Sequence, residues 1–112
     1  EAVSPPATPP APPPGFAALQ PLGPWPDTLR DLAAAGLHRL VLLGGADLAG
    51  QLLAEHLVDQ LQLTLCPRLL GGPHSWLPAG LDLASSRWTL LEQRVLEGEE
   101  LLLRYGRLSG PA

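Results

Sequence analysis

The chain has 112 residues and a formal net charge of −4 at pH 7, so it is long enough for one small domain. The acidic balance and the lack of any basic run argue against a nucleic-acid-binding surface, and we expect no nucleic-acid partner. No apolar run approaches the roughly 20 residues of a membrane span and no signal peptide is visible, so we expect no membrane partner and a cytoplasmic location. The single cysteine excludes an internal disulfide and fits a reducing compartment.

The beginning of the chain is rich in proline. Because proline removes backbone donors and favours the polyproline II conformation, residues Glu1–Pro24 are predicted to be a linker or loop. A short amphipathic helix is predicted next, since Pro26, Asp27 and Thr28 form a helix-start signal with Asp27 or Thr28 as the N-cap. Gly36 is the expected stop of this helix.

Four local patterns follow one another in the middle of the chain. The apolar run Leu40–Leu43 predicts a first strand over Arg39–Leu43 that is buried on both faces. Gly44 and Gly45 then turn the chain into a helix that Asp47 opens, and an alternating segment up to Leu65 predicts a second strand. Strand, helix and strand in this order predict a βαβ unit with parallel strands.

The last third of the chain combines a long loop with two strands. Prolines and glycines predict a loop over Pro67–Ser86, of a kind that often borders an active site. Trp88–Leu96 predicts a strand, Glu97-Gly98 a turn and Glu99–Tyr105 an antiparallel partner strand. The expected fold class is therefore α/β, with a βαβ core of mainly parallel strands and a C-terminal antiparallel hairpin. Residues 109–112 are expected to form a tail.

The side chains that commonly bind metals or act as nucleophiles follow no recognisable pattern. His38, His56, His74 and Cys66 show no metal-ligand spacing, so no metal site is predicted. His56 lies near a predicted helix C-terminus, and a favourable interaction with the helix dipole explains it better. No serine has a base nearby in the sequence, so no catalytic residue is named.

The glycine turn before the second predicted helix is the strongest candidate for a binding site. Backbone amides at a helix N-terminus point outward at the positive end of the dipole, where a phosphate binds. However, Gly44 and Gly45 with Gly50 form neither a dinucleotide fingerprint nor a P-loop. A tight connection that needs glycine only for positive φ or close packing explains the same residues, so both interpretations stay open.

A combination of four segments is more specific than any one of them. The segments are Gly36 with the strand after it, Leu43-Gly44-Gly45-Ala46-Asp47-Leu48-Ala49-Gly50, Leu57-Val58-Asp59-Gln60-Leu61 and Pro67-Arg68-Leu69-Leu70-Gly71-Gly72. Together they resemble the C-terminal half of the RibD-type reductase domain of riboflavin biosynthesis. The resemblance covers about Trp25 to Tyr105, and it assigns residues 25–108 to this half-domain.

The resemblance implies a dihydrofolate-reductase-like fold, present here as a partial domain. It implies an NADPH-dependent enzyme that reduces the ribosyl group of a ribosylamino-pyrimidine phosphate by hydride transfer. The NADPH phosphates would bind at Gly44, Gly45, Ala46, Asp47, Leu48, Ala49, Gly50 and Gln51. The loop Leu69–Gly72 would lie beside the pocket.

The resemblance also implies partners. They are a small-molecule pyrimidine substrate and the missing N-terminal half of the domain, to which nothing in the first 24 residues is similar. A first strand that is apolar on both faces needs sheet neighbours, and without them the chain would expose an apolar patch and associate. We therefore also expect a homodimer.

Leu43 stands where reductases of this family usually carry a glutamate that contacts the substrate. An apolar side chain cannot accept a hydrogen bond from a ribose. Leu43 thus favours an alternative of a different class, namely a non-catalytic, reductase-derived module for nucleotide binding or association.

Overall fold

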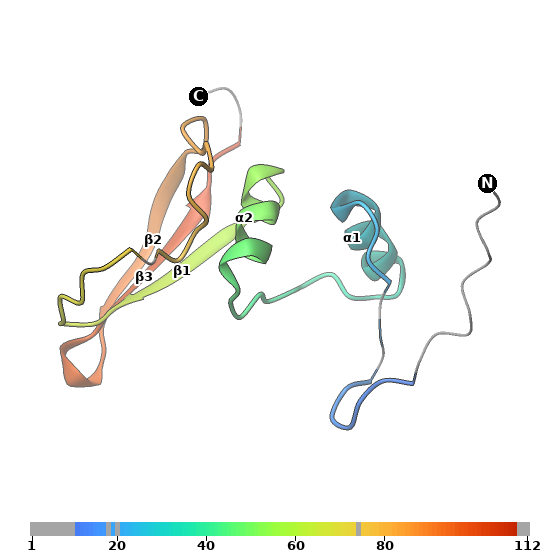
Figure 1. Ribbon diagram of the computed structural model, residues 1–112, viewed down its shortest axis with the longest axis horizontal. Helices are drawn as coiled ribbons and strands as arrows, with labels where there is room; N and C mark the ends of the chain where they lie inside the picture. Colours follow the sequence, from blue (N-terminus) through green and yellow to red (C-terminus); the bar gives the residue numbers. More distant parts are fainter. Residues whose placement is uncertain (1–10, 18, 20, 74, 110–112) are drawn as a thin grey trace. The chain divides into compact units, whose positions relative to one another are not determined.

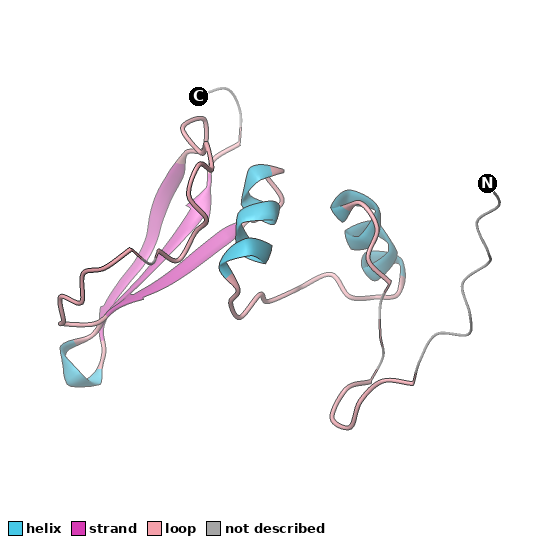
Figure 2. Ribbon diagram, in the orientation of Figure 1, coloured by secondary structure: helices cyan, strands magenta, loops and turns pink. Residues whose placement is uncertain are grey.

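The computed structural model describes residues 11–17, 19, 21–73 and 75–109. The chain divides into two compact units, Glu1–Leu40 and Val41–Ala112. In chain order the elements are α1 (Trp25–Ala34), α2 (Ala46–Ala54), β1 (Gln60–Leu65), β2 (Trp88–Val95), the 3₁₀ turn η1 (Glu97–Glu99) and β3 (Leu101–Arg107), as Figures 1 and 2 show. No helix in these ranges is both long and apolar enough to cross a membrane.

Some of the sequence predictions concern residues that lie outside the described ranges. Much of the expected linker 1–24 and of the expected tail 109–112 lies outside the described residues, as does His74. The described residues of 11–24 contain no helix or strand. The boundaries drawn at residues 24 and 108 stay predictions.

Helix α1 forms where the sequence predicts a helix, but its first residues differ from the prediction. Asp27 or Thr28 was the expected N-cap, whereas the structure places Pro24 there and Pro26 in the first turn. Proline suits the start of a helix because its φ is already helical and its missing N–H would have no partner there. Thr28 is instead buried, and its Oγ1 accepts a hydrogen bond of 3.2 Å from the Gly23 amide.

The end of α1 confirms the predicted role of Gly36. This glycine has a φ of +91°, and its N–H donates to the Ala33 carbonyl at 2.9 Å. The N–H of Leu37 donates to the Leu32 carbonyl, also at 2.9 Å. This pair of bonds is the Schellman motif, which satisfies the last carbonyls of a helix and needs a residue with positive φ.

Helix α2 ends with the same motif, but a histidine takes the position of the glycine. His56 has a φ of +57°, and its N–H donates to the Leu53 carbonyl at 3.1 Å. Leu57 completes the motif by donating to the Leu52 carbonyl at 3.0 Å. Because a Cβ atom disfavours this backbone conformation, His56 holds local strain at the exit of α2.

We predict that His56→Gly stabilises the chain. Relief of the left-handed strain outweighs the extra entropy of glycine in the unfolded state, and the gain should be about 0.5–1 kcal/mol. Urea unfolding followed by circular dichroism measures it. His56→Ala is the matched control, because it keeps the Cβ atom and should stay within about 0.3 kcal/mol of the parent chain. Equal stabilisation by both variants would assign the effect to the imidazole ring instead.

The predicted first strand is absent. Arg39–Leu43 has neither helix nor strand, and Val41 and Leu43 are 81% and 94% exposed. A strand needs neighbours for its backbone hydrogen bonds, and the three strands that the structure describes pair with one another. The predicted βαβ unit and its parallel strands are therefore wrong for the described part of the chain.

The sheet is antiparallel throughout, with the strand order β1-β3-β2. The prediction of a strand ending at Leu65 is confirmed by β1, and the predicted C-terminal hairpin is confirmed by β2 and β3. Gly98, with a φ of +73°, allows the turn between them, and Leu96 N–H closes it on the Glu100 carbonyl at 2.7 Å. The fold class is thus mixed α/β with an antiparallel three-stranded sheet.

Few side chains of the described residues are fully enclosed. Leu53 of α2 and Leu102 of β3 are the buried apolar residues, at 5% and 6% exposure. Arg107 fixes the end of β3 to the entry of β1: its Nε donates to the Val58 carbonyl at 2.9 Å, and its backbone N–H donates to the Asp59 carbonyl at 2.9 Å. The central strand is therefore held by both packing and hydrogen bonds.

Candidate functional site

The turn into α2 is built by two glycines in conformations that other residues rarely adopt. Gly44 and Gly45 have φ values of +141° and +98°. Gly45 is the N-cap of α2 and has no side chain to cap it. The N–H of Ala49 closes the first helical turn on the Gly45 carbonyl at 2.9 Å. The amides of the three residues before Ala49 consequently have no acceptor within the helix.

The backbone of this turn is open to an approaching ligand. A Cβ atom added at Gly44 would meet nothing within 4 Å, and one at Gly45 would meet only the Cβ of Leu48, at 3.9 Å. Outward-facing amides at the positive end of a helix dipole suit a phosphate group. The residues present therefore fit the phosphate of a nucleotide cofactor.

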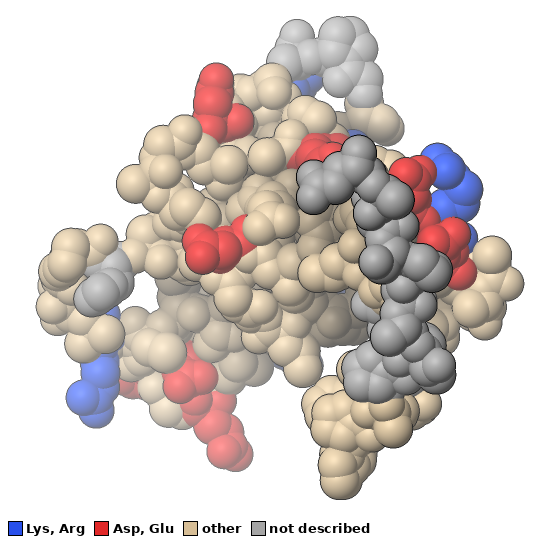
Figure 3. Space-filling view, turned by 45° about the vertical axis from the view of Figure 1, so that its right-hand side comes forward, with Lys and Arg blue, Asp and Glu red and all other residues tan. Residues whose placement is uncertain are grey.

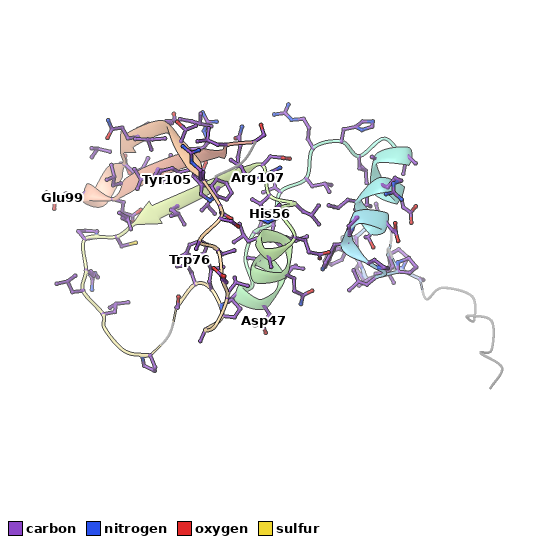
Figure 4. All side chains as sticks on the ribbon, turned by 90° about the horizontal axis from the view of Figure 1, so that it is seen from above. Asp47, His56, Trp76, Glu99, Tyr105 and Arg107 are labelled. Atoms are coloured by element: carbon purple, nitrogen blue, oxygen red, sulfur yellow. The ribbon has the colours of Figure 1, made fainter. Side chains whose placement is uncertain are left out.

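Asp47 adds a negative charge to the same helix end. It lies in the first turn of α2 and is exposed, and Figure 4 shows it at the opposite end of the helix from His56. A carboxylate at this position stabilises the helix through the dipole. It also repels an anion that approaches the same amides. Helix stability and phosphate affinity therefore oppose each other at Asp47.

A shallow groove of about 370 Å³ runs along α2 beside the turn. Its lining comes from α2 and from the long loop after β1: Asp47, Gly50, Gln51, Ala54, Pro78 and Leu81. Gly50 is buried, and a Cβ atom there would lie 2.9 Å from Cδ of Pro78 and 3.5 Å from Cδ2 of Leu81. The loop packs this closely on α2 because residue 50 has no side chain.

The structure brings the predicted site residues together only in part. Gly44 to Gln51 form one continuous turn and helix start, and three of these residues reach the groove. Leu69–Gly72, expected beside the pocket, do not line the groove, and Leu69 and Leu70 are exposed. Sequence reasoning missed Pro78 and Leu81, although a glycine inside a helix is a known sign of close packing.

Charged side chains do not single out another site. On the face drawn in Figure 3 the acidic and basic residues lie in small, scattered groups among uncharged residues, and in some groups the two charges lie side by side. In the described ranges no group of three or more His, Cys, Asp and Glu residues could hold a metal ion. Cys66 is exposed, and its Sγ lies 3.9 Å from Oε1 of Glu100.

Comparison with protein families identifies the chain. The model of the RibD C-terminal domain matches residues 23–100, a range that contains the whole turn and α2. The chain belongs to the RibD C-terminal domain family. The resemblance inferred from the sequence is thereby confirmed. The family points to a reductase of riboflavin biosynthesis.

A solved structure gives the same indication. The chain is similar to a candidate riboflavin biosynthesis protein from Shewanella sp. PV-4, with 25% sequence identity and a TM-score of 0.69. The match covers 78% of this chain and 48% of that one, so this chain spans about half the length of the Shewanella protein. The comparison with curated proteins gives no match.

We predict that Gly50→Ala destabilises the chain despite the better helix propensity of alanine. The added methyl would overlap the Pro78 ring, which cannot rotate away, and the net loss should be about 1–2 kcal/mol. Thermal or urea unfolding measures it.

The double variant Gly50→Ala with Pro78→Ala is the control. Removing the ring should restore most of the lost stability, because the two sites are in direct contact and therefore couple. Additive losses in the double variant would contradict the proposed packing.

Proposed function

We propose that the chain is the cofactor-binding half of an NADPH-dependent reductase of the RibD C-terminal type. The substrate class would be a ribosylamino-pyrimidine phosphate, whose ribosyl group is reduced. One observation carries the proposal: the glycine-opened N-terminus of α2 lies within the segment that the family model matches. NADPH, when bound, would supply the hydride.

The residues of this chain would bind and orient the cofactor. Gly44 and Gly45 leave the backbone accessible, and the first amides of α2 would donate to a phosphate oxygen. The groove between α2 and Pro78 continues from this point along the helix and offers a surface to the rest of the cofactor. No catalytic acid or base is assigned to this half.

The remaining parts of the proposal concern the assembly. A partial dihydrofolate-reductase-like domain would be completed by the N-terminal half that this chain does not contain, which is supported by the 48% coverage of the Shewanella protein. A homodimer and a cytoplasmic location belong to the same proposal. Exposed Val41 and Leu43 support an association of some kind.

Calorimetry with NADPH tests the cofactor site, with Gly45→Asp as the variant and Gly45→Asn as its matched control. Both side chains have the same shape, meet the same backbone strain and can cap the helix. Only aspartate adds a negative charge against the phosphate. We expect NADPH binding to the parent chain and a further loss of about tenfold in affinity for aspartate relative to asparagine. Equal affinities of the two variants would place the phosphate elsewhere.

A second prediction concerns Asp47. Asp47→Asn removes the charge that repels the phosphate, so NADPH affinity should rise about threefold while the helix loses about 0.3–1 kcal/mol of dipole stabilisation. Calorimetry and urea unfolding of the same preparation measure the two effects. Asp82→Asn, outside the helix, is the control and should change neither by a comparable amount. A fall in NADPH affinity would show that Asp47 faces a part of the ligand other than a phosphate.

The alternative function is a non-catalytic module for nucleotide binding or association. Leu43 favours it, because this residue is 94% exposed and has no polar group for a substrate. A single assay, the oxidation of NADPH, distinguishes the two functions. With the complementary half and a pyrimidine substrate present, a reductase oxidises NADPH, whereas the module binds NADPH and leaves it unchanged.

A further inference from the structure

The groove along α2 carries a negative charge at the end where the phosphate of the proposed cofactor binds. The helix contributes Asp47, Gly50, Gln51 and Ala54 to its lining, which are spaced as residues on one face of a helix. From Asp47 to Ala54 this face is about 10 Å long. Asp47 belongs to the first turn of α2, next to the glycine turn. A group that is joined to a phosphate at the glycine turn therefore meets Asp47 first.

The rest of the groove is mainly apolar. Pro78 and Leu81 form the wall opposite the helix, and both are half-buried. Gly50 and Ala54 add no polar side chain on the helix side. The volume of about 370 Å³ lies within the range of small-molecule sites. A nucleoside whose phosphate binds at the glycine turn would thus place its ribose beside Asp47 and its base against Pro78 and Leu81.

No positive charge lines this groove. All seven basic residues of the chain are arginines that the structure describes, and none of them is among the lining residues. Three of the arginines form ion pairs elsewhere in the chain, with N–O distances of 3.0 to 3.4 Å. NADPH differs from NADH by a phosphate on the adenosine ribose, and sites that select NADPH usually hold that phosphate with an arginine. The groove lacks this feature.

The carboxylate of Asp47 would act oppositely on the two cofactors. It can accept hydrogen bonds from the free ribose hydroxyls of NADH. The ribose phosphate of NADPH instead carries nearly two negative charges at pH 7, which the carboxylate repels. Because Asp47 is exposed, water and salt weaken this repulsion, so the effect should be several-fold rather than many orders of magnitude.

We propose that Asp47 makes this chain select NADH over NADPH, by accepting a hydrogen bond from the adenosine ribose and repelling a phosphate on it. This inference rests on the proposed cofactor site and deepens it, because it names the residue that sets the cofactor preference. Any preference of the complete reductase for NADPH would then come from the half-domain that this chain does not contain.

Calorimetric titration of the full chain with NADH and with NADPH tests the proposal. We expect NADH to bind about three- to tenfold more tightly than NADPH at low salt. The difference should shrink when sodium chloride is raised to about 0.5 M, since salt screens the repulsion at an exposed carboxylate. Both cofactors share the pyrophosphate, so their comparison isolates the effect of the ribose phosphate.

Two variants at one position test the role of the carboxylate. In Asp47→Asn the ratio of NADPH affinity to NADH affinity should rise at least about threefold, because the repulsion is lost and the remaining amide is a weaker acceptor. In Asp47→Arg the ratio should rise at least about tenfold, because a guanidinium binds the ribose phosphate. Asp82→Asn, which does not line the groove, is the matched control and should leave the ratio unchanged. A loss of helix stability in a variant affects both cofactors, so it does not change the ratio.

Two results would overturn the proposal and leave the cofactor site intact. One is a parent chain that binds NADPH as tightly as NADH or more tightly. The other is a ratio that stays the same in both Asp47 variants, which would place the ribose away from this residue. Binding of neither cofactor is a different result, because it would overturn the cofactor site itself and this inference with it.

Discussion

The pairing of β3 with a strand on each side is the interaction on which the described part of Val41–Ala112 depends. Strands β1 and β2 are separated by a long loop and share no ladder with each other, so β3 alone joins them. Leu102 is buried on this strand, and Arg107 ties its end to Val58 and Asp59. If β3 did not form, β1 and β2 would each lack a described pairing partner. Both would then be unstable, because isolated strands are not stable in water.

Local signals predicted the elements that the described chain itself stabilises. The two helices, β1 and the C-terminal hairpin follow from periodicity, capping and turn residues. The failed prediction, a strand over Arg39–Leu43, concerned a segment that pairs with none of the described strands. An apolar run indicates that a segment will be buried, but it does not say which polypeptide buries it. The assumption of parallel strands failed with it, because it rested on pairing that strand with β1.

The candidate site was also predictable only where its residues are contiguous in the sequence. The glycine turn and the start of α2 are contiguous in sequence, so Gly44 to Gln51 could be named from pattern and family resemblance. The wall formed by Pro78 and Leu81 could not, since it depends on how a long loop returns to the helix. Gly50 gave a partial signal: an interior helix glycine predicts a close neighbour, yet not the identity of that neighbour.

The apolar run Leu40–Leu43 and the glycine turn are adjacent, and this adjacency bears on the proposed cofactor site. In α/β proteins ligands bind where the chain leaves the carboxyl end of a strand. Val41–Leu43 pairs with no strand in the described structure. The turn at Gly44 and Gly45 is therefore joined to regular structure only on its C-terminal side, where α2 begins. A partner that pairs with this segment would reduce the ordering entropy that cofactor binding costs, and would tighten binding without touching the cofactor. By thermodynamic linkage, the cofactor must then tighten the binding of the partner by the same factor.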